Sequence, residues 1–301
     1  MADQFTQRLS KNAQTINIEL DRLLSNATLT GEITRPPRLM AAIRHGVLNG
    51  GKRIRPFLLI ESAAMFGVTG KGVIQAACAL ECLHCYSLIH DDLPSMDDDD
   101  LRRGQPTVHK AYDEAMAILA GDGLLTFAFD LMSDPLISDR AEIRANLVQM
   151  LARNAGHGGM IGGQVLDIAA ETSILNEAEI LQLQSMKTGA LLRFACEAGA
   201  VIADVSEQHR KALARFGEII GQAFQLADDL LDVTSSSTEL GKATGKDQAR
   251  GKKTLIDYHG IDGCNARLGQ LIVEANDLLA PFGEKAGILR QAAQFIIERK
   301  N

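Results

Sequence analysis

The sequence predicts an all-α protein that folds as one domain over residues 1–301. Six of the seven prolines lie before residue 136, and the stretch 136–280 contains none. That stretch is rich in Ala, Leu, Gln and Glu, which favour helices over strands. Alternating strand patterns are scarce, and no repeat occurs at a fixed period. With 301 residues and 46% hydrophobic content, the chain can bury a large core.

Apolar residues recur at helical spacing in three parts of the chain, and helix-breaking residues separate the predicted helices. The apolar stripes are formed by Ile16, Leu20, Leu23 and Leu24, by Ile180, Leu181 and Leu183, and by Leu271, Ile272, Leu278 and Leu279. Helix breaks are predicted at residues 30–37, 66–71, 133–139, 235–241 and 260–263. None of these breaks resembles a long linker, which agrees with a single domain.

A dense group of aspartates marks the end of a helix predicted over residues 78–90. Asp91 and Asp92 end its pattern, and four more aspartates follow after a four-residue spacer. Pro94 must interrupt the helix, because proline lacks a backbone donor and clashes with the preceding turn. We expect the loop to fold back so that Asp91 and Asp97 can reach one cation.

The second aspartate cluster needs no helix break. Asp228 and Asp232 are i,i+4 neighbours on a helix that is predicted to start near Glu207. Asp229 lies about 100° around the helix axis from Asp228. We therefore expect all three carboxylates to share one arc of that helix.

Carboxylates packed so densely repel one another unless cations neutralise them. Magnesium prefers hard oxygen ligands, and one or two carboxylates usually hold it together with substrate phosphates. Arg102 and Arg103 follow the first cluster at once, so a strongly negative and a strongly positive group adjoin. The combination predicts a magnesium-bound phosphate ester, although either cluster alone could equally be a solvated acidic patch.

Small residues beside Lys or Arg recur along the chain and suit phosphate binding. The backbone can approach a phosphate at such positions, while the side chain supplies charge or a bidentate fork. The motifs are Gly50-Gly51-Lys52-Arg53-x-Arg55, Arg102-Arg103-Gly104, Lys187-Thr188-Gly189, Leu240-Gly241-Lys242 and Gly251-Lys252-Lys253-Thr254. Each alone is weak, because Gly-Lys commonly ends helices. None completes a Walker loop, so nucleotide binding is poorly supported.

The composition argues against several classes of protein. The net charge is −7 and the pI is near 5.5, which argues against nucleic acid as a partner. The N-terminus carries charges throughout and has no apolar h-region, and no apolar run reaches the ~20 residues of a membrane span. Five cysteines without a secretory leader favour reduced thiols. We therefore expect a cytoplasmic protein with no membrane partner.

Several motifs occur together, in order, between about residues 50 and 254. They are the run from Glu81 to Gly104, Gly51-Lys52-Arg53, Gly163-Gln164, Lys187-Thr188-Gly189 and Phe224-Gln225-x2-Asp228-Asp229-x2-Asp232. Together they resemble the bacterial short-chain trans-prenyl diphosphate synthases, most of all the farnesyl diphosphate synthase group. Members of that family often have proline shortly after the final Lys-Thr, whereas Leu255 follows here, which leaves the start of the next helix open.

The resemblance implies an all-α isoprenoid synthase fold, with helices around a deep central cavity, and a homodimer. Such enzymes join an allylic diphosphate, dimethylallyl or geranyl, to isopentenyl diphosphate by ionisation, condensation and elimination. Farnesyl diphosphate is the expected product, with geranylgeranyl or geranyl diphosphate as alternatives. The departing diphosphate itself is expected to take the proton from the condensed intermediate.

The resemblance also implies roles for charged and polar residues around the allylic diphosphate. About three magnesium ions would be held by Asp91, Asp92, Asp97, Asp228 and Asp232. The diphosphate itself would be bound by Arg102, Lys187, Thr188, Gln225, Lys242 and Lys252. Catalytic roles fall on Asp91, Asp97, Lys187, Thr188, Gln225 and Asp228. Neutralised in this way, the diphosphate becomes a good leaving group.

Isopentenyl diphosphate needs an anion site of its own without metal, and the residues that match the family are Lys52, Arg55, His84 and Arg103. Thr188 and Gln225 would lie along the carbocation, where they supply oxygen dipoles and exclude water. Tyr86 lies about one and a half turns before Asp91 on the same helix. Its ring, with neighbouring Ser87, would limit product length; the alternative is a core tyrosine.

Other residues have competing interpretations. The glycines between positions 156 and 163 either pack helices closely or, with Gln164 and Asp167, line the pocket. His90 is expected to pack or to support a neighbouring residue rather than to act as a base. The basic pair at 299–300 is a surface feature or a lid over the homoallylic diphosphate.

Other functions remain open on the sequence alone. A metal phosphohydrolase built on His90-Asp91 would want further His and Asp ligands and would leave the second cluster idle. A terpene cyclase could use similar metals, but it would not need a second diphosphate site. A non-catalytic subunit of a heteromeric synthase would keep the fold and lose ligands, whereas both clusters are complete here.

Overall fold

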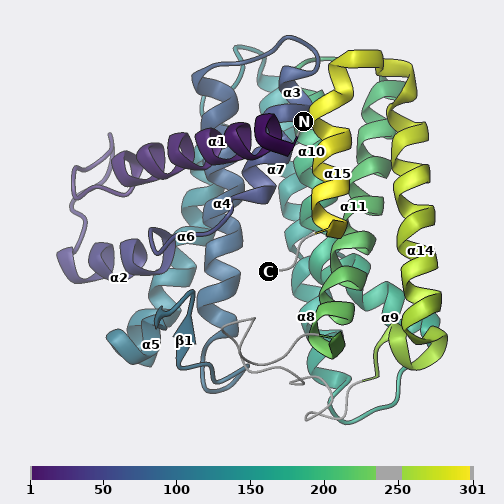
Figure 1. The fold of residues 1–301 in the computed structure, drawn as a ribbon. Helices are drawn as coiled ribbons and strands as arrows, with labels where there is room; N and C mark the ends of the chain where they lie inside the picture. The colour runs from purple at the N-terminus through teal and green to yellow at the C-terminus, as the bar shows by residue number, and fades with distance from the viewer. Residues whose placement is uncertain (1, 235–252, 299–301) are drawn as a thin grey trace. The chain divides into compact units, whose positions relative to one another are not determined.

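The computed structural model describes residues 2–234 and 253–298 of the chain (Figure 1). Within those residues the backbone is helical almost throughout. The strands found there form one small antiparallel hairpin, β1 (Leu101–Arg102) paired with β2 (Gln105–Pro106). The predicted all-α class is confirmed.

Internal contacts divide the chain into two compact units. Residues 3–60 and 69–148 form the first unit, and residues 61–68 together with the described part of 149–298 form the second. Two of the three boundaries between these ranges fall inside helices, α3 (Ile54–Ala64) and α7 (Ala141–Ala155). Each unit buries apolar side chains of its own. The expected single domain over residues 1–301 stays a prediction.

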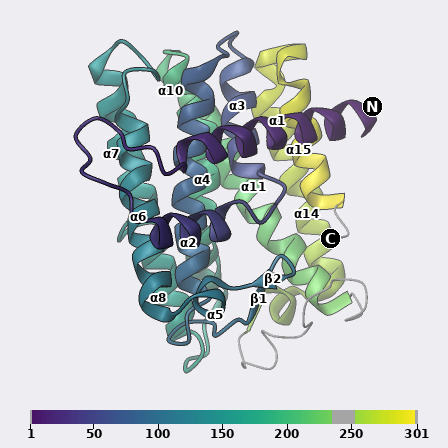
Figure 2. The same cartoon turned by 90° about the vertical axis from the view of Figure 1, so that its left-hand side faces the viewer.

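The first unit is built around α4 (Lys71–Asp91), which packs along α6 (Glu114–Ser133). Small residues cover much of α4, so neighbouring helices can approach it closely on several sides, and Leu80 and Leu83 are fully buried. The helix α2 (Pro37–Val47) lies across both of them (Figure 2). The unit also contains α1 (Ala2–Leu23) and α5 (Val108–Ala111).

By length and composition, α4 and α6 could each cross a membrane. The apolar window of α4 is 72% buried inside the protein, and that of α6 is 39% buried. A core helix of a globular protein passes the same test, because its neighbours take the place of lipid. For α4, the protein core accounts for the apolar sequence. Two large side chains of α6, Ile118 and Leu119, stay exposed.

The second unit is built around α11 (Glu207–Thr234), which packs against α10 (Ala190–Ile202) and α14 (Leu255–Leu279). The start of α11 at Glu207 is the predicted one. The shorter elements of the unit are α8 (Met160–Ala169), α9 (Glu177–Gln184), η1 (Ser185–Gly189), η2 (Ala280–Ala286) and α15 (Gly287–Glu298). Of these, η1 is a π-helical turn that joins α9 to α10 without a break.

The predicted helix breaks have different outcomes. Three of them coincide with gaps between helices, namely 30–37, 66–71 and 133–139. The break at 235–241 lies outside the described residues. The break predicted at 260–263 is confirmed at Gly260, where φ is +65° and ψ is 174°, so that two helical segments of α14 meet there across a kink. Glycine adopts this left-handed conformation without strain, so the chain bends there and stays helical on both sides.

Side-chain caps start two helices in the second unit. Asn176 accepts a hydrogen bond from the Glu179 N–H at 3.1 Å, and the Glu179 carboxylate accepts one from the Asn176 N–H at 2.8 Å. Thr254 and Asp257 form a similar capping box at the start of α14. This capping box fixes the start of α14 at Leu255, although no proline stands at the first position of the helix. The gap before Asn176 was not among the predicted breaks, although its Asn-x-x-Glu signal is visible.

All five cysteines are buried and free. Burial raises the pKa of the Cys85 thiol to about 12, with Glu81 adding to the shift. A thiol of this kind stays protonated near neutral pH, so it is a poor metal ligand or nucleophile. The cysteines therefore belong to the core, which agrees with the reduced thiols expected from the sequence.

Candidate active site

The first aspartate cluster lies on a turn that folds back onto the end of α4. The helix ends at Asp91, and the N–H of Asp97 donates a hydrogen bond to the C=O of Asp91 at 2.8 Å. This contact brings the two aspartates side by side, as we expected from the helix break at Pro94. Both side chains are half-buried. The turn thus brings the two residues together through their backbones, and the metal role of the two carboxylates stays a prediction.

Asp92 differs from its neighbours because it is buried and bound by an arginine. Its Oδ1 accepts hydrogen bonds from Nε of Arg102, at 2.9 Å, and from Nη2 of the same side chain. Arg102 also reaches the carboxylate of Asp99 at 3.5 Å. Burial raises the pKa of Asp92, and the bond from Arg102 opposes that shift. In this structure Asp92 holds Arg102 beside the cluster, and its expected role as a metal ligand stays a prediction.

Three of the four residues predicted for isopentenyl diphosphate lie close together in the first unit. Nη1 of Arg55 is 3.3 Å from Nε2 of His84. Arg103 donates to Oδ1 of Asn49 at 3.0 Å and to the C=O of Gly50. Its guanidinium occupies the space where a Cβ on Gly51 would lie, so a side chain at that position would displace it. The fourth residue, Lys52, is exposed and follows this glycine directly.

Burial and a group of arginines hold the pKa of His84 well below its ordinary value. Burial is the largest cause, and Arg55 and Arg103 come next, because a second positive charge near a guanidinium is unfavourable. The imidazole is therefore neutral at pH 7. It can exchange a directional hydrogen bond with an anion while the arginines supply the charge.

Arg53, which stands between Lys52 and Arg55 in the sequence, has a structural role. Its Nη1 lies 2.5 Å from Oε1 of Glu81, and both side chains are at most 2% exposed. It also donates to the C=O of Val47 at 2.6 Å and to Oδ1 of Asn17 at 3.0 Å. Its backbone φ of +51° accompanies this inward placement. Neighbouring basic residues of one motif thus differ in role: Arg53 is paired in the core, whereas Lys52 and Arg55 remain predicted to bind isopentenyl diphosphate.

Glycines let α8 approach the π-helical turn η1 in the second unit. A Cβ on Gly163 would lie 2.6 Å from the Cα of Lys187, and a Cβ on Gly162 would strike the C=O of His157. Close packing is therefore what the structure shows for Gly163, and the pocket-lining alternative for this glycine segment stays a prediction. The approach brings Asp167 of α8 to Lys187, with Oδ2 and Nζ 2.5 Å apart.

The motif Lys187-Thr188-Gly189 lies inside the π-helical turn itself. A π turn widens an α-helix by one residue, and such turns often occur at functional sites. Gly221 of α11 packs against Gly189, because a Cβ on Gly221 would lie only 2.6 Å from the Cα of Gly189. No signal in the sequence predicted this turn.

The aspartates of the second cluster point in different directions. Asp228 and Asp232 are half-buried, whereas Asp229 is only 4% exposed. Oδ2 of Asp229 accepts a hydrogen bond from Nε2 of Gln184 at 3.0 Å, and Oδ1 of Asp229 accepts one from Nε2 of Gln225 at 3.1 Å. The expectation that all three carboxylates share one arc is therefore wrong. A rotation of about 100° is enough to turn Asp229 from the half-buried side of α11 into the core.

Tyr86 is a buried residue of α4, 5% exposed, and its hydroxyl has no hydrogen-bond partner among the described residues. Its ring meets that of His90 edge to face, with centroids 5.7 Å apart. Burial, with Asp91 adding to it, raises the pKa of the phenol to about 12. Ser87, the other residue predicted to limit product length, is half-buried and donates to the C=O of His84 at 2.8 Å.

His90 packs against α6, as expected for a residue that supports rather than reacts. Its Nε2 is 3.0 Å from the C=O of Ile118. Gly121 leaves space for the ring, because a Cβ there would clash with it. The structure thus shows a packing contact for His90 through Nε2, in keeping with the expected supporting role.

The donor atoms in both units fit magnesium only if a substrate adds oxygens. Within residues 2–234 and 253–298, no three His, Cys, Asp or Glu side chains are gathered so that they could hold a metal ion by themselves. Magnesium is usually bound by one or two carboxylates and substrate phosphates, which is what paired half-buried aspartates can offer. Lys242, Lys252, Arg299 and Lys300 lie outside the described residues.

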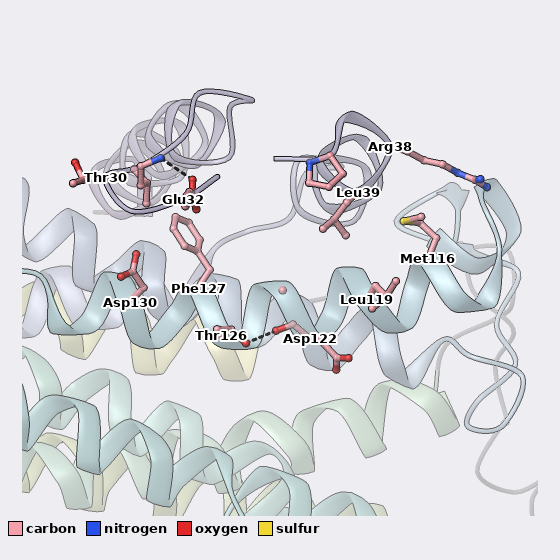
Figure 3. A pocket seen from close by; sticks show the side chains of 13 residues that line it. Thr30, Glu32, Arg38, Leu39, Met116, Leu119, Asp122, Thr126, Phe127 and Asp130 are labelled. Atoms are coloured by element: carbon pink, nitrogen blue, oxygen red, sulfur yellow. Dashed lines mark hydrogen bonds between the residues drawn. The ribbon is translucent and has the colours of Figure 1, made fainter. Parts of the chain in front are cut away.

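A groove of about 730 Å³ lies elsewhere in the first unit, between α6 and the chain that joins α1 to α2 (Figure 3). Leu39, Leu119 and Phe127 contribute much of its apolar lining, and Arg38 lies at its edge. None of the predicted site residues lines this groove.

The sequence profile of a family described as polyprenyl synthetase matches residues 36–279. The chain belongs to the polyprenyl synthetase family. As a polyprenyl synthetase it has the all-α isoprenoid synthase fold, in agreement with its helices and with the resemblance seen in its motifs.

Similar polyprenyl synthetases come from bacteria and plants. The farnesyl diphosphate synthase of Escherichia coli (strain K12) is 42% identical over 268 residues, which cover 87% of this chain and 89% of that protein. A chloroplastic geranylgeranyl pyrophosphate synthase of Catharanthus roseus is 40% identical and covers 94% of this chain and 79% of its own. Among solved structures, an FPP/GFPP synthase from Zymomonas mobilis has a TM-score of 0.88 at 38% identity, covering 99% of this chain and 100% of its own.

We predict that His84 makes the protein less stable as pH falls, because its pKa is lower when folded than when unfolded. The unfolded ring takes up a proton near its ordinary pKa of about 6.5, whereas the folded ring does so only at lower pH. Stability should therefore be fully present above about pH 6.5 and decline as pH falls toward the folded value. The free energy of unfolding in urea, measured between about pH 7.5 and 5.5, checks this.

The His84→Gln variant should show a shallower decline over the same range, and the exposed His157→Gln serves as the matched control. If His84→Gln declined as steeply as the wild type, the depressed pKa would be contradicted.

Proposed function

We propose that the chain is a magnesium-dependent prenyltransferase that condenses dimethylallyl or geranyl diphosphate with isopentenyl diphosphate and yields farnesyl diphosphate. The observation that carries the proposal is the presence of two different charge environments on α4. Its end carries the folded-back aspartate turn, while His84, less than two turns earlier, lies among Arg55 and Arg103. One environment suits a metal-bound diphosphate, and the other suits a diphosphate bound without metal.

The allylic diphosphate is assigned to the acidic clusters. When bound to Asp91, Asp97, Asp228 and Asp232, magnesium would neutralise the diphosphate and so improve it as a leaving group. Arg102 stays beside the first cluster because Asp92 holds it. Lys187 stays at the π turn because Asp167 holds it, and its charge would add to the neutralisation. Lys242 and Lys252 are assigned the same role from the sequence.

Isopentenyl diphosphate is assigned to Lys52, Arg55, His84 and Arg103. Guanidinium groups bind diphosphate oxygens through paired, charge-assisted hydrogen bonds. Asn49 and the C=O of Gly50 hold Arg103 in position before substrate arrives, which reduces the ordering that binding would otherwise require. This metal-free site distinguishes the proposal from a terpene cyclase, which handles one diphosphate.

The family also suggests a homodimer that acts in the cytoplasm. Within the described residues, the incompletely buried α6 and its exposed Ile118 and Leu119 offer an apolar surface that a second copy would cover. Light scattering should then give a mass of about twice the 32.5 kDa of one chain.

The proposed reaction is tested by incubating the purified chain with Mg²⁺, isopentenyl diphosphate and dimethylallyl, geranyl or farnesyl diphosphate in turn. We expect a C15 product from the two shorter primers, as measured by mass spectrometry, and no product after metal removal with EDTA. Asp91→Ala and Asp228→Ala should each lower kcat by at least about 10²- to 10³-fold, because each removes part of the charge that stabilises the departing diphosphate.

Asp139→Ala, at an exposed aspartate outside both clusters, serves as the control and should keep the wild-type rate. Full activity in both cluster variants would contradict the metal assignment. Release of phosphate or diphosphate without a longer prenyl product would contradict condensation.

Geranylgeranyl diphosphate is the second candidate product, since a geranylgeranyl pyrophosphate synthase is 40% identical to this chain. Tyr86 decides between the two candidates if its ring limits the space for the growing chain. Tyr86→Ala should shift the main product from C15 to C20 or longer, because the ring is removed and its hydroxyl leaves no partner unpaired among the described residues. Product chain length is the measurement.

The matched control is Tyr258→Ala, at an exposed tyrosine of the second unit, which should leave product length unchanged. An unchanged distribution in Tyr86→Ala would show that Tyr86 is a core residue and does not limit the product.

A further inference from the structure

Four side chains of the second unit form a continuous line of hydrogen bonds. Gln184 ends α9, Thr188 lies in the π turn, and Gln225 and Asp229 belong to α11. Nε2 of Gln184 donates to Oδ2 of Asp229 at 3.0 Å, and Nε2 of Gln225 donates to Oδ1 of Asp229 at 3.1 Å. At the far end, the hydroxyl of Thr188 donates to Oε1 of Gln225 at 3.2 Å. The line thus connects α9, α11 and η1.

The carboxylate of Asp229 sets the direction of every bond in this line. A carboxylate only accepts hydrogen bonds, so both amides must turn their NH2 groups toward it. Gln225 then has its carbonyl oxygen toward Thr188, and Thr188 must donate to that oxygen. The two ends of a glutamine amide are hard to tell apart by shape alone, but here the partner decides which end is which.

The burial of Gln184 indicates that its hydrogen bond to Asp229 compensates for the cost of placing a polar side chain in the core. The residue is 7% exposed, and its Oε1 is buried with no hydrogen-bond partner among the described residues. An unpaired buried amide oxygen is unfavourable, so an apolar side chain of similar length would avoid a penalty at this position. The polar contact made by the other end of the amide is the compensating interaction that the structure shows.

The direction of the line determines what Thr188 can offer to a ligand. A hydroxyl has one hydrogen, and Thr188 gives that hydrogen to Gln225. Its oxygen therefore presents only lone pairs to any other group that approaches it. Lone pairs stabilise a positive charge, whereas a hydroxyl hydrogen turned the other way would oppose it.

We propose that Gln184 and Asp229 are positioning residues that fix the polarity of Gln225 and Thr188, so that Thr188 presents lone pairs to the positive charge of the ionised allylic substrate. This inference rests on the proposed function, because it requires an ionisation step. It also separates Asp229 from Asp228 and Asp232, since its two oxygens are engaged by amides. Gln184 belongs to none of the motifs that carry the family resemblance.

Two substitutions test the line with little change in shape. Asp229→Asn keeps the size of the side chain but adds donors, so that Gln225 and Thr188 can reverse their hydrogen bonds. Gln184→Met keeps the length and removes the donor. Gln182→Met is the matched control, because it makes the same change at an exposed position of the same helix.

In the condensation of geranyl with isopentenyl diphosphate, kcat should fall about 100-fold in Asp229→Asn and about tenfold in Gln184→Met. The KM values for both substrates should change less than about twofold, because the effect is confined to the charged transition state. Gln182→Met should match the wild type. General damage to the site would raise KM as well, and that result would overturn the proposal.

The Mg²⁺ concentration that gives half the maximal rate should also stay unchanged in Asp229→Asn. A large rise would overturn the positioning role and assign Asp229 as a metal ligand. If Asp229→Asn does not fold, Gln184→Met carries the test by itself, and an unchanged kcat in that variant would overturn the proposal.

A double-mutant cycle shows whether the effect passes through the hydroxyl. In a Thr188→Val background, Asp229→Asn should lower kcat by less than about twofold more. Valine has no hydroxyl, so the group whose direction Asp229 is proposed to set is already absent. A further loss of about 100-fold would overturn the proposal. An inactive wild-type protein would contradict the proposed function, whereas an active wild type with an unaffected Asp229→Asn would overturn only the positioning role.

Discussion

A buried charge must be paired, and this constraint divides the aspartates of both clusters into two kinds. Asp92 is buried and bound by Arg102, and Asp229 is buried between two glutamine amides. Their neighbours in the sequence, Asp91 and Asp228, are half-buried. Adjacent residues of a helix point about 100° apart, so a pair of aspartates at the edge of a core naturally has one member facing inward. The outward carboxylate is suited to a cation, and the inward one positions another side chain.

The same constraint sorts the basic residues. Arg53 is buried and is paired with Glu81, so it holds helices together rather than a ligand. Arg55 and Arg103 are less buried, and the neutral imidazole of His84 near them adds no further positive charge, so their charge is left for an anion. Glycine makes this arrangement possible, since a side chain at position 51 would displace the guanidinium of Arg103. Pairing within the core and charge at its edge thus account for both the acidic and the basic groups.

The sequence was enough to predict the all-α class and several helix ends, because these depend on local chemistry. Pro94 ends α4 where it should, and the aspartate turn folds back as its spacing suggested. Spacing along a helix gives the angle between two side chains but not the direction of the core, which is why the burial of Asp229 was missed. The π turn and the contact of Gln184 depend on helices that meet only in the folded chain, so no local pattern carried them. The break at Gly260, by contrast, was predictable from local chemistry, because glycine leaves the helical conformation there without strain.

The central claim is that each cluster has too few outward carboxylates to bind magnesium tightly unless phosphate oxygens also bind the metal. Isothermal titration calorimetry of Mg²⁺ into the protein, with and without inorganic diphosphate, tests this most directly once the heat of magnesium binding to diphosphate alone is subtracted. The account predicts weak binding to the protein by itself and binding at least about tenfold tighter with diphosphate present, an enhancement that is lost in an Asp91→Asn, Asp228→Asn double variant. Tight magnesium binding without diphosphate, or an enhancement that survives in the double variant, would contradict it.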